Sequence, residues 1–178
     1  MTVARVKGSS TKIKRPLIDT GTCIVVPLTR QQFAIVDRED HHLVDGWNWT
    51  AFIGGRSFYA ARREGGKLVS MAREILMVKI NEQADHINHD TLDNRRANLR
   101  ASTASQNQHN KMAMKNNTSG YKGVYLEWDG KWRATIAVNR KRFRLGRFTC
   151  PVKAAKAYDE AARELHGEFA CLNFPEES

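Results

Sequence analysis

The C-terminal part of the chain carries the strongest folding signal in the sequence. Three runs rich in β-branched and aromatic residues are separated by the short turns "DGK" and "NRK", and they predict antiparallel strands over residues 121–128, 131–138 and 142–148. Residues 151–167 follow as an amphipathic helix, with Pro151 at its start and Gly167 at its C-terminal cap. Packing this helix on one face of the sheet makes a two-layer unit.

The two faces of the predicted sheet differ in character, because side chains alternate along a strand. The helix-facing side is expected to hold apolar residues: Ala134, Ile136, Val138, Phe143 and Leu145. They would meet the apolar stripe of the helix: Ala154, Ala157, Tyr158, Ala161 and Leu165. The opposite face carries mostly arginine: Arg133, Thr135, Arg142 and Arg144. More cations lie nearby: Lys122, Lys131, Arg140, Lys141 and Arg147.

The whole chain is basic, with a formal net charge of +10 over 178 residues. Such a chain either has an anionic partner, most often nucleic acid, or exposes a merely solvated charged surface. Solvated strands normally mix both signs, whereas only Glu127 and Asp129 oppose the cations between residues 122 and 147. The pattern therefore favours a sheet face that enters a DNA major groove. The basic residues before residue 23 predict a flexible arm, which either touches DNA phosphates or is simply disordered.

The first half of the chain predicts a different small sheet. Residues 23–71 contain strand-like runs broken by paired glycines, which indicates an antiparallel meander. No run of about 18 apolar residues is present, so no membrane span is expected, and the N-terminus lacks the apolar core of a secretory signal. Three scattered cysteines argue against a disulfide scaffold or a structural zinc, and they indicate a reducing, intracellular setting.

Residues 85–100, "DHINHDTLDNRRANLR", are unusually rich in aspartate and asparagine, which are poor formers of regular structure. Hydrolysis of a phosphodiester needs a base that deprotonates water and a divalent cation at the scissile phosphate. An aspartate and an asparagine amide oxygen suit a hard cation such as magnesium. Asp85 and His86 are adjacent, so on a strand they would point to opposite sides, although a bend can bring both to one site. Each residue taken alone is more often structural.

The C-terminal segment resembles a known family. "GYKGVYLEWDGKWRATIAV", the "LGRF" strand, the "AAKAYDEAA" helix and the "LNF" end are similar to the Apetala/ethylene-response-factor DNA-binding domain. The resemblance implies that the sheet lies in the major groove. The family's contact positions map to Lys122, Tyr125, Lys131, Thr135, Arg142, Arg144 and Arg147, and the outer face adds Arg133. The family often has arginine or tryptophan at Tyr125, Glu127, Ala137 and Arg144, so its plant DNA target does not carry over.

The polar block resembles a second family. Asp85-His86, then Asn98, then Asn107 are similar to the HNH endonuclease motif, and most closely to homing-type enzymes of phages and introns. The resemblance implies a ββα-metal fold in which Asp85 and Asn107 bind a divalent metal, Mg²⁺ with Mn²⁺ as the alternative. It implies that His86 is the general base and that Asn98 holds the loop. Arg73, Arg95, Arg96 and Arg100 are then candidates for phosphate contact.

Two positions depart from the second family. Ala72 stands where these enzymes usually have a histidine, and His89 stands where glycine is usual. Ala72 favours a rival interpretation, a sequence-specific DNA-binding protein whose nuclease region is inactive. A third possibility, an RNA-binding or RNA-cleaving protein, is disfavoured because the outer sheet face is rich in arginine rather than in aromatic residues for stacking.

The sequence as a whole predicts an α+β protein with four segments. These are a basic arm (1–22), an HNH nuclease domain with an N-terminal β-meander (23–112), a linker (113–117) and the DNA-binding domain (118–175). The predicted reaction is metal-dependent hydrolysis of double-stranded DNA, as one nick per active site. We expect no membrane and no small-molecule substrate, a monomer or dimer, and the cytoplasm of a bacterial or phage-infected cell.

Overall fold

The computed structural model describes residues 14–55, 57–114 and 116–175. Two compact units make up the chain: Met1–Ile75 with Thr91–Asn98, and Leu76–Asp90 with Leu99–Ser178. Antiparallel sheets and a few short helices give the mixed α+β class that the sequence predicts. In the described ranges, no helix is long and apolar enough to cross a bilayer.

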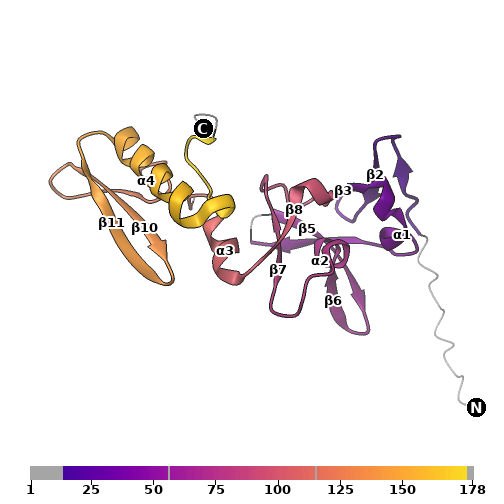
Figure 1. Ribbon diagram of the computed structural model, residues 1–178. Helices are drawn as coiled ribbons and strands as arrows, with labels where there is room; N and C mark the ends of the chain where they lie inside the picture. Colours follow the sequence, from indigo (N-terminus) through magenta and orange to yellow (C-terminus); the bar gives the residue numbers. More distant parts are fainter. Residues whose placement is uncertain (1–13, 56, 115, 176–178) are drawn as a thin grey trace, which may run out of the picture. The chain divides into compact units, whose positions relative to one another are not determined.

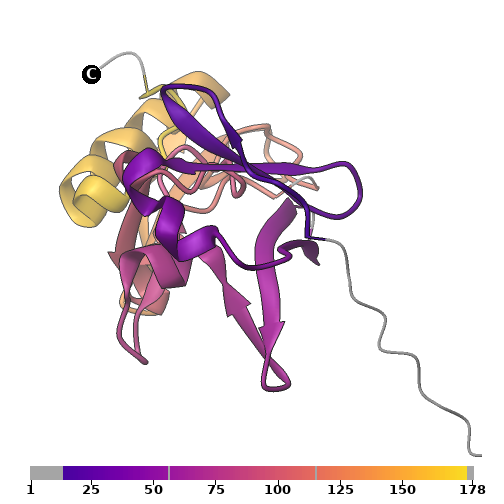
Figure 2. The same cartoon turned by 90° about the vertical axis from the view of Figure 1, so that its right-hand side faces the viewer.

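The first unit contains two three-stranded antiparallel sheets, with strand orders β1-β2-β3 and β4-β5-β6. Its elements are β1 (Ile18–Asp19), β2 (Cys23–Pro27), β3 (Phe33–Asp37), η1 (Arg38–Asp40), α1 (His41–Val44), β4 (Thr50–Gly54), β5 (Ser57–Glu64), β6 (Lys67–Ser70), α2 (Met71–Leu76) and η2 (Arg96–Asn98). In Figure 2 the indigo strands β2 and β3 and the purple strands β5 and β6 form separate sheets. The predicted single meander is therefore two small sheets.

The ordered part of the chain begins earlier than the sequence predicts. Residues 1–13 of the predicted arm lie outside the described residues, but residues 18–19 pair with β2. The guanidinium of Arg15 donates to the carbonyl of Pro27 at 3.0 Å, and its backbone N–H donates to Asn48 at 3.0 Å. Arg15 thus satisfies backbone and side-chain acceptors of this unit, a use of a basic residue that charge alone does not reveal.

A later stretch of the polar block also belongs to the first unit. The Ile35 N–H donates to the Leu92 carbonyl at 2.9 Å, and the Asn94 N–H donates to the Ile35 carbonyl at 2.8 Å. Arg96 binds the buried carboxylate of Asp40 through both Nε and Nη2. Backbone pairing and an ion pair therefore dock residues 91–98 onto β3.

The second unit contains the hairpin-like pair β7–β8, the three-stranded sheet β11-β10-β9 and the helix that covers it. Its elements are β7 (Gln83–His86), β8 (Leu99–Ser102), α3 (Ala104–His109), β9 (Val124–Leu126), β10 (Trp132–Val138), β11 (Lys141–Phe148), α4 (Pro151–His166) and η3 (Gly167–Phe169). Figure 1 shows α4 lying along the sheet of β10 and β11. The predicted three strands and capped helix are confirmed, with Pro151 in the first turn and Gly167 at the C-cap.

The core between α4 and the sheet is made mainly of small residues, as predicted: Val124, Ala134, Ile136, Ala154, Ala155, Tyr158 and Ala162. Two expectations were wrong. Leu165 is 45% exposed, because His166 and not Leu165 continues the buried stripe of α4. Phe143 is 49% exposed, although it lies opposite Ile136, because β11 is an edge strand of the sheet.

Candidate functional site

The centre of the candidate nuclease site is the end of β7. Asp85 and His86 are buried there, 5% and 7% exposed. Across the β7–β8 ladder, Asp85 lies opposite Arg100, which donates from Nε and Nη2 to Asp85 Oδ2 at 2.9 Å. The same guanidinium donates to the carbonyl of Glu168 and stacks over the Phe169 ring, 4.1 Å from its centroid. A buried carboxylate needs such compensation, and Arg100 provides it here.

Helix α3 lies along β7 in a defined register. The Asn107 amide donates to Gln83 Oε1 at 2.6 Å. One turn later, the buried Asn110 amide donates to Asp85 Oδ1 and Oδ2, at 3.0 and 3.1 Å, and to the His86 carbonyl at 3.0 Å. Residues two apart on a strand share a face, and so do residues three apart on a helix. This spacing explains why Asn107 meets Gln83 and Asn110 meets Asp85.

The sequence analysis named Asn107 and missed Asn110. The structure brings Asn110 to Asp85, whereas Asn107 is half-buried and bonded to Gln83. The only signal for Asn110 in the sequence was its spacing of three residues from Asn107, and that spacing becomes informative only when the helix is known to pack on β7.

The predicted loop-holding residue, Asn98, lies in the first unit. It is 7% exposed, and its amide donates to the Asp93 carbonyl at 2.8 Å. This is the kind of contact expected of a residue that fixes a loop. Arg73 occupies α2 of the same unit, next to Ala72, which is 3% exposed.

Two of the arginines predicted to contact phosphate already have acidic partners in the first unit. Arg95 bonds both oxygens of Asp93 at 2.8 Å, and this hydrogen-bonded carboxylate raises the pKa of Arg95. Arg96 is paired with Asp40, which raises its pKa in the same way. Both guanidinium groups remain about half exposed, so each keeps a surface open to solvent.

The donor set at Asp85 fits a hard cation. Among the described residues no group of three or more histidine, cysteine, aspartate or glutamate side chains is placed to hold a metal ion. Magnesium is commonly held by one or two carboxylates together with waters and substrate phosphates. Asp85 Oδ1 accepts only the Asn110 amide, so it keeps a lone pair for such an ion, whereas Oδ2 is occupied by Arg100.

The backbone conformation at His89 explains why glycine is usual at this position in the family. Its backbone φ is 65°, in the left-handed region where glycine is strain-free and other residues are uncommon. The ring Nε2 lies 3.8 Å from the sulfur of Cys171. Burial lowers the pKa of His89 and raises that of Cys171, so both groups are held neutral near pH 7.

The strand register places most of the predicted DNA-facing residues on one face of the sheet, although Thr135 is only 5% exposed and the register shifts between Ala134 and Thr135. Residues opposite each other across an antiparallel ladder share a face. The pairs on the side away from α4 are Tyr125 with Arg133, Arg133 with Arg147, Thr135 with Arg144, and Ala137 with Arg142. Arg142 also lies over the Tyr125 ring, 5.9 Å from its centroid.

The arginines of this outer face are not equivalent. Arg133 and Arg147 both bond Glu127, and Arg147 also bonds Asp129, which raises the pKa of Arg147 and lowers that of Asp129. Arg142 and Arg144 are exposed, and neither forms an ion pair with a carboxylate in the described ranges. Lys131, at the entry to β10, is exposed as well.

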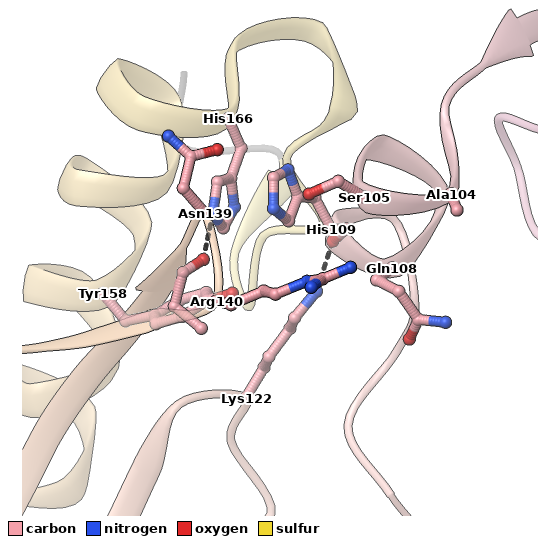
Figure 3. Close-up of a pocket in the computed structure, with 10 residues that line it drawn as sticks. Ala104, Ser105, Gln108, His109, Lys122, Asn139, Arg140, Tyr158 and His166 are labelled. Carbon is pink, nitrogen blue, oxygen red and sulfur yellow. Dashed lines mark hydrogen bonds between the residues drawn. The ribbon is translucent and has the colours of Figure 1, made fainter.

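Lys122 is placed differently from the other predicted contacts. Its ammonium group donates to the backbone carbonyl of His109, at the C-terminal end of α3. Burial lowers the pKa of the Lys122 amine. Figure 3 shows its side chain reaching toward Arg140 and the C-terminal end of α3, in a cavity that both residues line.

Comparison with known proteins agrees with both resemblances. A family model for HNH endonucleases matches residues 79–109, and a model for the AP2 domain matches residues 119–168. A protein of Acanthamoeba polyphaga mimivirus named uncharacterized HNH endonuclease L560 is 30% identical over 147 residues, which cover 79% of this chain and 74% of that protein. The chain belongs to the HNH endonuclease family.

The AP2 domain of this HNH endonuclease is similar to plant proteins. The Arabidopsis thaliana ethylene-responsive transcription factor ERF010 is 48% identical over 58 residues, 32% of each chain. The dehydration-responsive element-binding protein 2E of Oryza sativa subsp. japonica is 51% identical over 57 residues, 31% of this chain and 18% of that protein. The chain thus spans a third or less of these plant relatives. The HNH endonuclease combines a nuclease domain with an AP2-type DNA-binding domain.

Proposed function

We propose that this HNH endonuclease is a metal-dependent, homing-type enzyme that nicks double-stranded DNA, directed to its target by the outer face of β9–β11. The observation that carries the proposal is the buried Asp85–His86 pair on β7, whose carboxylate is held by Asn110 and Arg100. Binding DNA through a sheet face requires no buried aspartate followed by a buried histidine, whereas hydrolysis of a phosphodiester uses a carboxylate and an imidazole.

In the proposed mechanism, a Mg²⁺ ion held at Asp85 would neutralise charge on the scissile phosphate and stabilise the leaving 3′-oxygen. Asp85, through Oδ1, and Asn107 supply protein oxygens to the ion. His86 takes the proton from the attacking water. Asn98 fixes the loop after β7. Arg73, Arg95 and Arg96 are proposed to contact DNA phosphates.

Asn110 has a separate role in this proposal. Its amide bonds both oxygens of Asp85 and the backbone of His86, so it sets the orientation of the carboxylate relative to the base. Asn110 is therefore proposed as a positioning residue that acts through Asp85, not as a group that touches DNA or metal. Positioning of this kind matters because misplaced reacting groups lose much of their rate advantage.

Nicking of a supercoiled plasmid pool with random inserts tests the proposal. The wild-type protein should convert supercoiled to open-circular DNA with Mg²⁺ and not with a chelator, and His86→Ala should abolish this conversion. His41→Ala is the matched control, because His41 is an exposed histidine at the start of α1. Equal nicking by wild-type protein and His86→Ala would refute His86 as the base.

A second candidate function is sequence-specific DNA binding with an inactive nuclease. Ala72 supports it, because it replaces the usual histidine and is itself buried in α2. Retarded migration of inserts selected from the random pool, together with no cleavage in any divalent metal, would favour this alternative. Metal-dependent nicking by the unmodified protein would exclude it.

A further inference from the structure

A cavity of about 450 Å³ lies along the part of β10 that β9 does not cover. Its walls come from three elements of the second unit: α3, the β10–β11 turn and α4 (Figure 3). The polar lining residues are Ser105, Gln108, His109, Lys122, Asn139, Arg140, Tyr158 and His166. The nuclease hairpin is followed directly by α3, so the cavity adjoins the helix that carries Asn107 and Asn110.

The charge of this cavity is wholly positive. Lys122 and Arg140 line it, and no carboxylate does. Among the described carboxylates, none is ion-paired with either residue, in contrast to Arg133 and Arg147 on the outer face. The one hydrogen-bond acceptor of the Lys122 ammonium is a neutral backbone carbonyl. Burial lowers the pKa of Lys122, and the buried carboxylate of Asp159 offsets this only in part, so a bound anion would further stabilise the ammonium group.

The backbone holds Arg140 at the mouth of this cavity. Asn139 and Arg140 form a two-residue hairpin turn with φ of 50° and 64°. Such turns favour glycine at the second position, whereas arginine adopts this conformation at some cost. In Figure 3 the side chains of Arg140 and Lys122 extend into the same space below the paired histidine rings.

Two stacked imidazoles form one wall of the cavity. The rings of His109 and His166 are parallel to within 9°, with centroids 3.7 Å apart. Nε2 of His166 lies 3.1 Å from the Ala137 carbonyl, so it carries the proton. The other nitrogen, Nδ1, is buried and has no hydrogen-bond partner within the described part of the chain. This wall joins α3 to α4 and fixes the shape of the cavity.

We propose that this cavity binds a phosphate group of the DNA backbone, held by Lys122 and Arg140. The inference rests on the proposed function and adds a contact to it. DNA backbone is favoured over free phosphate because Arg140 directly precedes β11, whose Arg142 and Arg144 lie on the outer sheet face. A strand lying on that face would pass a phosphate to the cavity, and this contact would fix the spacing between the bases that the sheet reads and the bond that is cut.

The test is the salt dependence of binding to a random-sequence duplex, in chelator so that no cleavage occurs. The slope of log K against log salt is negative, and each lost phosphate contact reduces its magnitude by about 0.9. Arg140→Gln should reduce the magnitude by that amount. Ser105→Phe, which fills the cavity without changing charge, should do the same. Lys153→Gln is the charge-matched control, because Lys153 is exposed on α4 and outside the cavity, and its slope should equal that of the wild type.

A second arm separates the two sources of phosphate. Inorganic phosphate is titrated while the ring signals of His109 and His166 are followed by NMR. Suppose that inorganic phosphate shifts these signals in the wild type but not in Arg140→Gln, and that the DNA slope is unchanged in Arg140→Gln. The ligand is then free phosphate, and the DNA assignment is overturned. If neither response depends on Arg140, the cavity binds no phosphate. A wild-type protein that binds no duplex would instead overturn the proposed function itself.

Discussion

The contrast between two asparagines of α3 gives the sharpest test of the nuclease geometry. Asn110 is 5% exposed, and its two amide hydrogens serve three oxygens: both oxygens of Asp85 and the carbonyl of His86. A hydrogen bond to a charged group contributes about 1.5–3 kcal/mol and a neutral one about 0.5–1.5 kcal/mol. Asn110→Ala should therefore lower the free energy of unfolding by about 2–4 kcal/mol.

Asn107→Ala is the matched control. Asn107 is half-buried, and its amide bonds the exposed side chain of Gln83 in a solvent-exposed contact, so its loss should cost about 0.5 kcal/mol. Urea unfolding of both variants in chelator, followed by circular dichroism, measures this difference. If Asn107 is a metal ligand, calorimetry should also show weaker Mn²⁺ binding by Asn107→Ala at nearly unchanged stability. Equal destabilisation by the two substitutions would refute the register of α3 on β7.

Three further predictions concern stability. Ala72→His places an imidazole at a site that is 3% exposed, so overpacking should cost about 1–3 kcal/mol in urea unfolding; an unchanged midpoint would mean that the site has room. Gly123→Ala puts a Cβ 2.1 Å from a Tyr158 ring carbon at a φ of 77°, so it should lower stability by more than about 2 kcal/mol in thermal unfolding. An unchanged melting temperature would contradict this. Burial lowers the pKa of His166, so the unfolded chain gains a proton first as pH falls below about 6.5. Wild-type stability should thus fall between about pH 7 and pH 5 by more than that of His166→Gln, and parallel pH profiles would contradict this.

Local sequence was enough to predict the AP2-type sheet and its helix. The apolar residues Ala134 and Ile136 indicate the face that packs on the helix, and the turns between strands are too short to permit other pairings. The order Asp85-His86, Asn98, Asn107 was enough to indicate an HNH motif. Both patterns involve residues close together in the sequence, so they can be recognised without knowledge of the tertiary fold.

Only the tertiary structure decided which partners buried polar groups find. Asp159 lies in the buried stripe of α4, because the backbone N–H groups of Asn173 and Phe174 bond its carboxylate at 2.8 Å. His166 replaces Leu165 in that stripe, because the Ala137 carbonyl accepts its proton. In both cases the stabilising partner is distant in sequence, and it comes close only when the chain folds.

The same reason explains the candidate site. Whether Asn107 or Asn110 meets Asp85 depends on how far α3 is shifted along β7, and a shift of one turn exchanges them. Lys122 was expected beside the outer-face arginines, but the end of α3 offers it a carbonyl and a buried cavity instead. The sequence by itself indicated candidate residues for the chemistry, and the packing of helix against strand decided which of them face one another.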